Sequence, residues 1–196
     1  MRHILHVSIS LMTALCAFFT AAPVSAQNAA AGGASGGALG NVSISFSFKR
    51  QNVIASNQVA VWIEDESGAI VKTLYISRFT GKGGFSIRPD SLSAWVAKAK
   101  PSSPAELDAF TGATPKNGSV TYVWDCTDGE GKPVPAGAYR YCVEGSLYWK
   151  SNALFTGSVT IGKNADSSRA APVYSSDDPA HRAMLQQVQA VFTPRG

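Results

Sequence analysis

Residues 42–48 alternate strictly between apolar side chains and serines. Val42, Ile44, Phe46 and Phe48 fall at every second position, with a serine between each pair. Successive side chains of a β-strand point to opposite faces of a sheet, so this alternation predicts a strand with one buried face and one polar face. The segment therefore favours a fold in which a sheet covers an apolar core on one side.

Further segments have the composition of strands and are separated by turn-forming residues. Residues 58–63 and 70–76 flank an acidic turn with a glycine, Glu64–Gly68, which predicts a hairpin with a solvated tip. Residues 184–192 fit a short helix or a strand, and their alternation favours a closing strand paired near the first. Other strands are expected at 120–126, 138–149 and 154–161. Together these strands predict an all-β, immunoglobulin-like antiparallel β-sandwich.

One short helix is expected between the strands. The apolar residues between 92 and 99 recur with helical spacing, and Asp90 or Ser91 can serve as the N-cap. Pro101 and Pro104 would end the helix, because proline cannot donate the backbone hydrogen bond that a further turn needs.

The N-terminal residues predict an exported protein. Residues 1–26 combine Arg2, an apolar run and small residues ending at Ala26, which is typical of a cleavable signal peptide. We therefore expect a periplasmic protein with a flexible leader at 27–40 and one domain at 41–196, loose at 162–180.

The charge balance limits the partners of the mature chain. Loss of Arg2 leaves 16 basic residues against the 13 acidic ones, without basic clusters. Nucleic acid is therefore not an expected partner. Nor do we expect the mature chain to insert stably into a membrane.

Cys126 and Cys142 remain in the mature chain, where the compartment permits oxidation. They lie on two runs expected to form neighbouring strands, so a cross-strand disulfide is one alternative. The other alternative is two half-buried thiols that act as small hydrophobic groups.

The usual catalytic and metal-binding sets cannot be assembled from this sequence. His181 is the one histidine left after cleavage, which excludes a histidine-rich metal site or a Ser-His-Asp relay. Asp125, Asp128 and Glu130 do not have the spacing of a twelve-residue calcium loop and fit a turn stabilised by aspartates better.

Several segments resemble known families. Residues 124–128 and 131–139 are similar to a strand–turn–strand unit of bacterial immunoglobulin-like modules, such as the one in flagellar hook-capping proteins. Most of the mature chain resembles an uncharacterised family of predicted bacterial periplasmic proteins. Membership would imply company with extracytoplasmic flavin transferases and membrane-bound redox proteins. The segments that carry this second resemblance are 61–64, 77–82, 88–92, 111–114 and 139–147.

The segment Asp108–Thr114 resembles the acceptor site of flavin-mononucleotide (FMN) binding subunits of membrane electron-transport complexes. The matching positions are Asp108, Thr111, Gly112, Ala113 and Thr114. The resemblance implies that a magnesium-dependent flavin transferase esterifies FMN to Thr114. The chain would then be a redox carrier or accessory protein that works with a membrane redox protein, rather than an enzyme with its own catalytic residues.

Physical chemistry is consistent with these residue types. A threonine hydroxyl is a weak nucleophile, so it must enter another protein's active site for activation. Gly112 and Ala113 add no bulk, and a glycine can let the loop protrude. Pro115 favours extended geometry at Thr114. Candidates for stacking on the flavin are Trp95, Phe110 and Tyr122, and candidates for offsetting the phosphate charge are Arg78, Lys82 and Lys116.

Two alternatives to flavin attachment remain. The segment can be an unmodified surface loop, rich in threonine, glycine and proline for that reason. The protein can also be a non-enzymatic binding or assembly module that docks a membrane redox protein through its sheet faces or loops.

Overall fold

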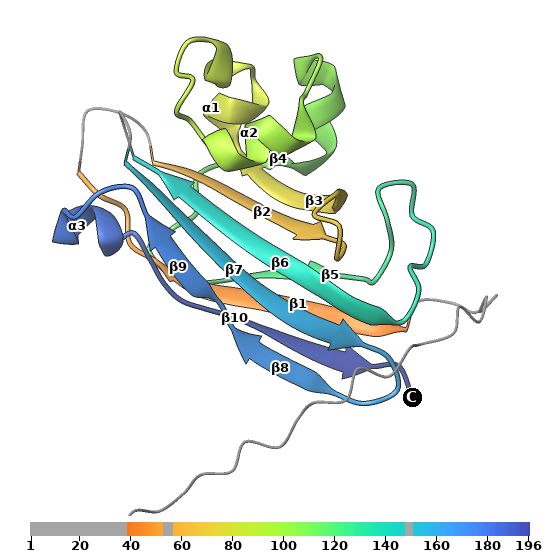
Figure 1. Cartoon of the computed structure of the whole chain (residues 1–196). Helices are drawn as coiled ribbons and strands as arrows, with labels where there is room; N and C mark the ends of the chain where they lie inside the picture. The colour runs from red at the N-terminus through yellow and green to blue at the C-terminus, as the bar shows by residue number, and fades with distance from the viewer. Residues whose placement is uncertain (1–38, 53–56, 148–150) are drawn as a thin grey trace, which may run out of the picture. The chain divides into compact units, whose positions relative to one another are not determined.

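The protein is an all-β structure of two sheets with a few short helices (Figure 1). The computed structural model describes residues 39–52, 57–147 and 151–196. The expected signal peptide and residues 27–38 of the leader lie outside this range. The strands are β1 (Gly40–Phe48), β2 (Gln58–Glu64), β3 (Ile70–Ser77), β4 (Thr111–Gly112), β5 (Gly118–Trp124), β6 (Gly137–Ser146), β7 (Asn152–Ile161), β8 (Asp166–Arg169), β9 (Ala171–Tyr174) and β10 (Leu185–Pro194).

The four-stranded sheet has the order β5-β1-β10-β8, and the six-stranded sheet has the order β4-β3-β2-β6-β7-β9. The predicted alternation of β1 is confirmed, since its four apolar side chains are at most 2 % exposed and point into the core between the sheets. The closing strand is also confirmed. β10 pairs antiparallel with β1 from Gly40 opposite Pro194 to Phe48 opposite Leu185.

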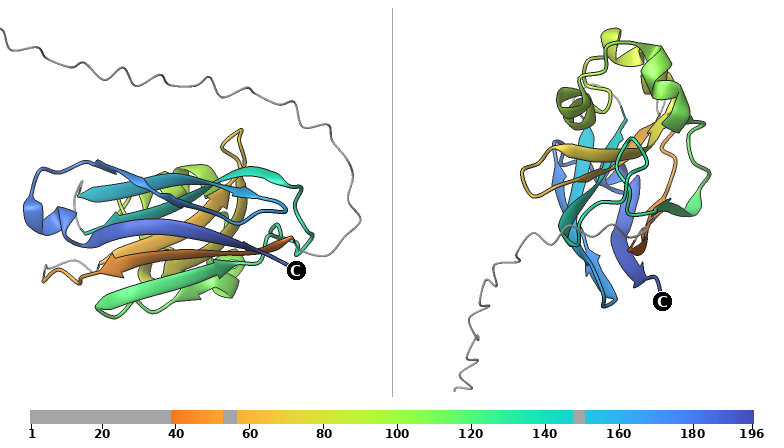
Figure 2. Two further views of the ribbon diagram at one scale, coloured as in Figure 1. Left: turned by 90° about the horizontal axis from the view of Figure 1, so that it is seen from below. Right: turned by 90° about the vertical axis from the view of Figure 1, so that its right-hand side faces the viewer.

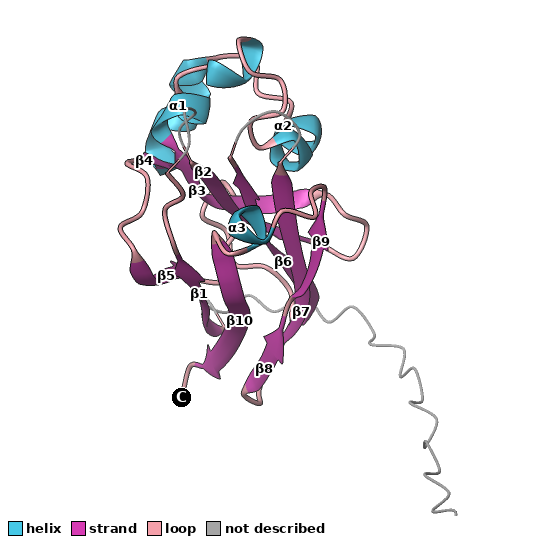
Figure 3. Ribbon diagram, turned by 90° about the vertical axis from the view of Figure 1, so that its left-hand side faces the viewer, coloured by secondary structure: helices cyan, strands magenta, loops and turns pink. Residues whose placement is uncertain are grey.

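β2 is buried at every position because its two faces meet different partners. Val59, Val61 and Ile63 face the core between the sheets. Ala60 and Trp62 belong to a second apolar cluster on the other side. There the sheet packs against residues 78–110, the helical cap, whose helices gather at one end of the molecule (Figure 3). The cap comprises α1 (Arg78–Gly81), the 3-10 helix η1 (Gly84–Ser86), α2 (Ser93–Ala99) and the 3-10 helix η2 (Pro104–Phe110).

The expectation of a single capped helix is wrong in two respects. The cap contains three further helical segments, and α3 (Pro179–Arg182) follows β9. Neither Asp90 nor Ser91 caps α2, whose N-cap residue is Leu92 at φ 52° with no side-chain hydrogen bond. The free N–H groups of the first turn are bound instead by Glu144 on β6, a partner that lies about fifty residues away in sequence.

The segment 162–180, expected to be loose, contains two short strands. β8 pairs with β10 in the four-stranded sheet, whereas β9 pairs with β7 in the six-stranded sheet. Each strand has only four residues and is ordered by a ten-residue neighbour. A run of four residues is too short to show an alternation from which a strand can be predicted.

β5 and β6 were expected to be neighbouring strands, but they lie in different sheets. The loop between them, residues 125–136, contains a polar turn in which the Asp128 carboxylate accepts hydrogen bonds from the Glu130 and Lys132 N–H groups, both at 2.9 Å. β6 ends at Ser146, and residue 149 of the expected strand lies outside the described range. Within the described part of the chain, no helix has the length and apolar character needed to cross a bilayer.

Candidate functional site

The segment Asp108–Thr114 runs from the end of η2 through β4 into the coil before β5. β4 pairs in parallel with Ile76 and Ser77 at the edge of the six-stranded sheet. Gly112 is not among the residues with positive φ, so it does not make the loop protrude as expected. A Cβ at Gly112 would lie 2.7 Å from Cε2 of Tyr75, which explains why this position has no side chain.

Three of the residues that precede Thr114 in the segment have structural contacts. Asp108 forms an exposed ion pair with Lys82 at 2.9 Å, and this contact holds the pKa of Asp108 below its usual value. The Thr111 hydroxyl donates to the Leu107 carbonyl at 2.6 Å. The Ala113 carbonyl accepts a hydrogen bond from the Tyr75 hydroxyl at 2.6 Å. These contacts fix the chain up to residue 113.

Thr114 is held less firmly than its neighbours. Its hydroxyl donates one long hydrogen bond of 3.3 Å to the carbonyl of Asn57, and the residue is half-buried. No described residue hydrogen-bonds to the backbone of residues 114–117. The hydroxyl of Thr114 can therefore be freed at small cost.

Three basic residues lie in the chain segments next to this end of the motif. The backbone N–H of Arg50 donates to Oδ1 of Asn117 at 2.7 Å, which brings residues 49 and 50 beside residues 116 and 117. Lys49, Arg50 and Lys116 are all exposed. In the described part of the chain none of the three forms an ion pair, whereas Lys82 is already paired with Asp108. The chain on either side of Asn117 thus carries exposed basic side chains without an ion-pair partner among the described residues.

The aromatic candidates differ in their burial and in the rings they contact. Trp95 is fully buried against the six-stranded sheet and meets Phe110 edge-on at 6.3 Å between ring centroids, so Trp95 cannot stack on a ligand. Tyr122 is half-buried and stacks on Tyr75 at 4.8 Å. Because Tyr75 also binds Ala113, Tyr122 is the aromatic candidate that the structure brings near Thr114.

The two cysteines are free thiols in the structure and are not joined by a disulfide. Cys126 follows β5 and lies in the core between the sheets, whereas Cys142 on β6 faces the helical cap. The failure of the expected β5–β6 pairing explains their separation. Burial raises the pKa of Cys126 to about 11 and that of Cys142 to about 12, which keeps both thiols protonated and unreactive.

Sequence reasoning missed two buried carboxylates beneath the cap. Glu144 is 1 % exposed, and its two oxygens accept the N–H groups of Ala94 and Trp95 at 3.0 and 2.8 Å. Glu64, placed in the solvated hairpin tip from the sequence, is 3 % exposed and forms ion pairs with Lys98 and Arg140. A charged residue within or at the end of a largely apolar strand is the signal that could have identified both, since Glu144 lies in β6 and Glu64 ends β2.

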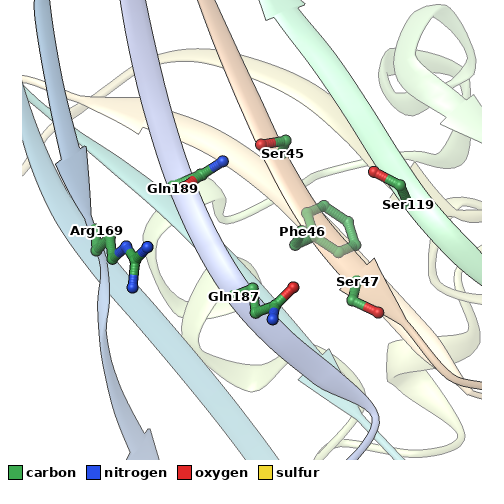
Figure 4. Close-up of a pocket in the computed structure, with 7 residues that line it drawn as sticks. All are labelled: Ser45, Phe46, Ser47, Ser119, Arg169, Gln187 and Gln189. Carbon is green, nitrogen blue, oxygen red and sulfur yellow. The ribbon is translucent and has the colours of Figure 1, made fainter.

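A hollow of about 380 Å³ lies on the outer face of the four-stranded sheet. Figure 4 shows that its side chains come from all four strands of that sheet. In the described chain, none of the polar side chains that line it forms a hydrogen bond or ion pair with another residue. These side chains are Ser45, Ser47, Ser119, Arg169, Gln187 and Gln189.

Gln187 has φ 55° and lies at a bulge where β10 carries one residue more than β1 between Ser45 and Ser47. The hollow therefore coincides with an irregularity in the ladder. Metal binding has no comparable support. Among the residues that the structure describes, no three His, Cys, Asp or Glu side chains are close enough to hold an ion.

No curated protein and no solved structure matches the chain. A family model does match, over residues 41–174, and its description is "Predicted periplasmic protein (DUF2271)". The match covers both sheets except β10, together with the helical cap and the segment Asp108–Thr114. The chain thus belongs to this family of periplasmic proteins.

Proposed function

We propose that the protein serves an extracytoplasmic electron-transfer system and carries FMN esterified to Thr114. One observation supports this proposal above the others. Side-chain or backbone contacts fix residues 108–113, and Thr114 follows them with a hydroxyl held by a single 3.3 Å hydrogen bond. The segment thus presents one weakly held hydroxyl on a rigid support.

The attachment step balances without an external oxidant or reductant. The Thr114 oxygen attacks the FMN phosphorus of flavin adenine dinucleotide in the active site of a transferase, a base of that enzyme takes the hydroxyl proton, and AMP leaves. The new phosphodiester bears a negative charge, and the exposed basic residues Lys116 and Arg50 in the adjoining segments would offset it. The flavin would supply the redox chemistry. Tyr122, which stacks on Tyr75, would lie at the same edge of the sandwich as the flavin.

Attachment also changes the protein locally. The modified Thr114 has no proton to donate to the Asn57 carbonyl, so this contact is lost. Asn57 is otherwise tied to Gln51 by two hydrogen bonds, from Gln51 N at 2.8 Å and to Gln51 O at 2.9 Å. We therefore expect the segment 114–117 to move while the remainder of the sandwich keeps its structure.

Intact-mass measurement after co-expression with a flavin transferase tests the proposal. The wild-type protein is expected to gain the mass of one FMN less one water and to fluoresce in a denaturing gel. Thr114→Ala should abolish the adduct, whereas Thr121→Ala, an exposed threonine on β5, should retain it. Unmodified wild-type protein in cells where the same transferase labels a known acceptor would overturn the proposal.

The outer face of the four-stranded sheet favours a second candidate, a module that docks a membrane redox protein. Its hollow contains six polar side chains without partners in the described chain, which are available to a partner. Binding to a purified membrane redox protein from the same host would separate the two candidates. Gln189→Lys should weaken docking at least tenfold, whereas Thr114→Ala should leave docking unchanged.

We also propose that the sandwich is of the immunoglobulin type. The Tyr139 hydroxyl donates to the Pro135 carbonyl at 2.9 Å, just after the chain crosses from β5 to β6. A tyrosine that bonds back to the backbone a few residues upstream, at a corner between the sheets, is a hallmark of that fold. A crystal structure whose strand order departs from immunoglobulin topology would exclude this classification.

A further inference from the structure

The edges of the two sheets differ in how well they are protected from pairing with another chain. A free strand edge exposes backbone N–H and C=O groups, and proteins usually shorten, charge or cover it. β4 has two residues, and β9 has four with Pro172 among them. β8 has four residues with a charge at each end, Asp166 and Arg169. The remaining edge of β3 carries Lys72, which binds Asp125 and Thr127 of the neighbouring loop.

β5 has none of these protections. It is seven residues long, has neither proline nor a charged residue, and is the outermost strand of its sheet (Figure 2, left). Within the described chain its backbone pairs with β1 alone. The N–H and C=O groups on its other side are therefore open, and Val123 is 57 % exposed beside them.

We infer that the open edge of β5 pairs with β5 of a second copy of this chain, antiparallel and about a two-fold axis near Thr121. Pairing of this kind places side chains of the same face opposite each other, so that Ser119 meets Val123 and Val120 meets Tyr122. No charged residue of β5 has to be buried or placed against a like charge.

Charges at the two ends of the strand favour the antiparallel arrangement. Lys116 lies two residues before β5, and Asp125 directly follows it. A two-fold axis near Thr121 sets Asn117 of one copy opposite Asp125 of the other, with Lys116 beside them. Parallel pairing would instead bring Lys116 next to Lys116 and Asp125 next to Asp125.

Pairing would join the two four-stranded sheets into one continuous eight-stranded sheet. Ser119 lines the hollow and belongs to β5, so the hollows of both copies would adjoin the seam on the same outer face. Pairing through β5 involves neither Thr114 nor a flavin, so the inference does not depend on the proposed function.

Sedimentation velocity over a range of protein concentrations, with hydrogen exchange of the β5 amides, tests the inference. We expect a reversible dimer whose formation slows exchange at β5. Thr121→Lys places two ammonium groups across the axis and should raise the dissociation constant at least tenfold. Ser45→Lys is the matched control, because Ser45 lies directly opposite Thr121 on the interior strand β1 and on the same face. It should leave dimerisation unchanged.

Two results would overturn the inference. One is a monomer at every concentration with β5 amides that exchange freely. The other is an oligomer that Ser45→Lys disrupts as strongly as Thr121→Lys, because association would then involve the face of the sheet and not its edge. Circular dichroism of both variants shows whether each remains folded.

Discussion

The outer faces of the two sheets differ in what covers them. The six-stranded sheet packs Trp62 and Cys142 against the helical cap, so that β2 is buried at every position. Among the described residues nothing covers the outer face of the four-stranded sheet, the bare face, and β1 keeps the alternation of a strand with one covered face. The burial pattern of a central strand therefore reports whether a third layer lies on its sheet.

The polar side chains of the two faces also differ in their hydrogen-bond and ion-pair partners. Beneath the cap, the carboxylates of Glu144 and Glu64 are bound by backbone N–H groups and by basic side chains. On the bare face the serines, glutamines and Arg169 around the hollow have no partner in the described chain. The covered face is thus organised for stability, whereas the bare face retains groups that can serve an external partner.

Truncation of Trp95 tests this difference with the largest expected effect. Trp95→Ala removes a fully buried side chain between the cap and the sheet and should lower the free energy of unfolding by about 3–5 kcal/mol. Val191→Ala on the bare face, where the residue is 43 % exposed, should change it by less than about 0.5 kcal/mol. Urea denaturation followed by tryptophan fluorescence and circular dichroism measures both. Similar losses would show that the two faces contribute alike.

The buried carboxylate of Glu144 should make stability depend on pH. Burial raises its pKa to about 7, against the opposing effect of the Trp95 and Ala94 N–H groups. Because the folded pKa exceeds the unfolded one, the folded state binds the proton more tightly, and stability falls as pH rises towards and through 7. We expect a loss of roughly 2 kcal/mol between pH 5 and pH 8.

Denaturation at a series of pH values measures this loss, and Glu144→Gln should flatten the profile. The amide has one acceptor oxygen for two N–H groups, so this variant is expected to be less stable overall. Glu106→Gln, at an exposed carboxylate, should leave the profile unchanged. A wild-type profile that rises from pH 5 to pH 8 would contradict the raised pKa.

Alternation in the sequence predicted the strands that have one covered face, but it did not predict which strands belong to the same sheet. The alternation of β1 and β10 was sufficient because each of these strands has one apolar face. β5 and β6 are joined by a loop typical of hairpins, yet they separate into two sheets, and this choice depends on packing across the whole domain. The position of the cysteines depended on that pairing and was missed with it.

The sequence proposed a candidate site at Asp108–Thr114, but it could not predict what surrounds that segment. The contacts of Gly112 with Tyr75 and of Thr114 with Asn57 join segments that lie 37 or more residues apart. The same limit applies to the N-terminus of α2, where Glu144 replaces a local cap. Long-range side-chain partners of this kind leave no pattern in a short window of sequence.

Gly112→Ala tests whether this glycine is needed for close packing against Tyr75. The added Cβ would lie 2.7 Å from the Tyr75 ring, which is buried and stacks on Tyr122, and should destabilise the protein by about 1–3 kcal/mol. Thermal unfolding measures the loss, with the exposed Ala113→Ser as control. A neutral Gly112→Ala would show that the ring has more space than the structure indicates.

The smallest expected effect concerns the backbone of the bare face. Gln187 has φ 55°, a left-handed conformation that costs a residue with a Cβ about 1–2 kcal/mol, whereas glycine adopts it freely. Gln187→Gly should therefore stabilise the protein by roughly 0.5 kcal/mol after the entropy of glycine in the unfolded chain is included. Gln189→Gly, on the same strand and face but without positive φ, should destabilise it by about 0.5–1 kcal/mol.

The opposite signs of these two substitutions distinguish strain from ordinary strand geometry. Denaturant titrations of both variants in parallel resolve a difference of this size. If Gln187→Gly proves stabilising, a glutamine at this position is retained at a cost in stability. Its side chain lines the hollow, so the benefit that offsets the cost is expected to be contact with whatever binds there. Two destabilising substitutions would instead mean that Gln187 is favourable where it stands and that the bare face stores no strain.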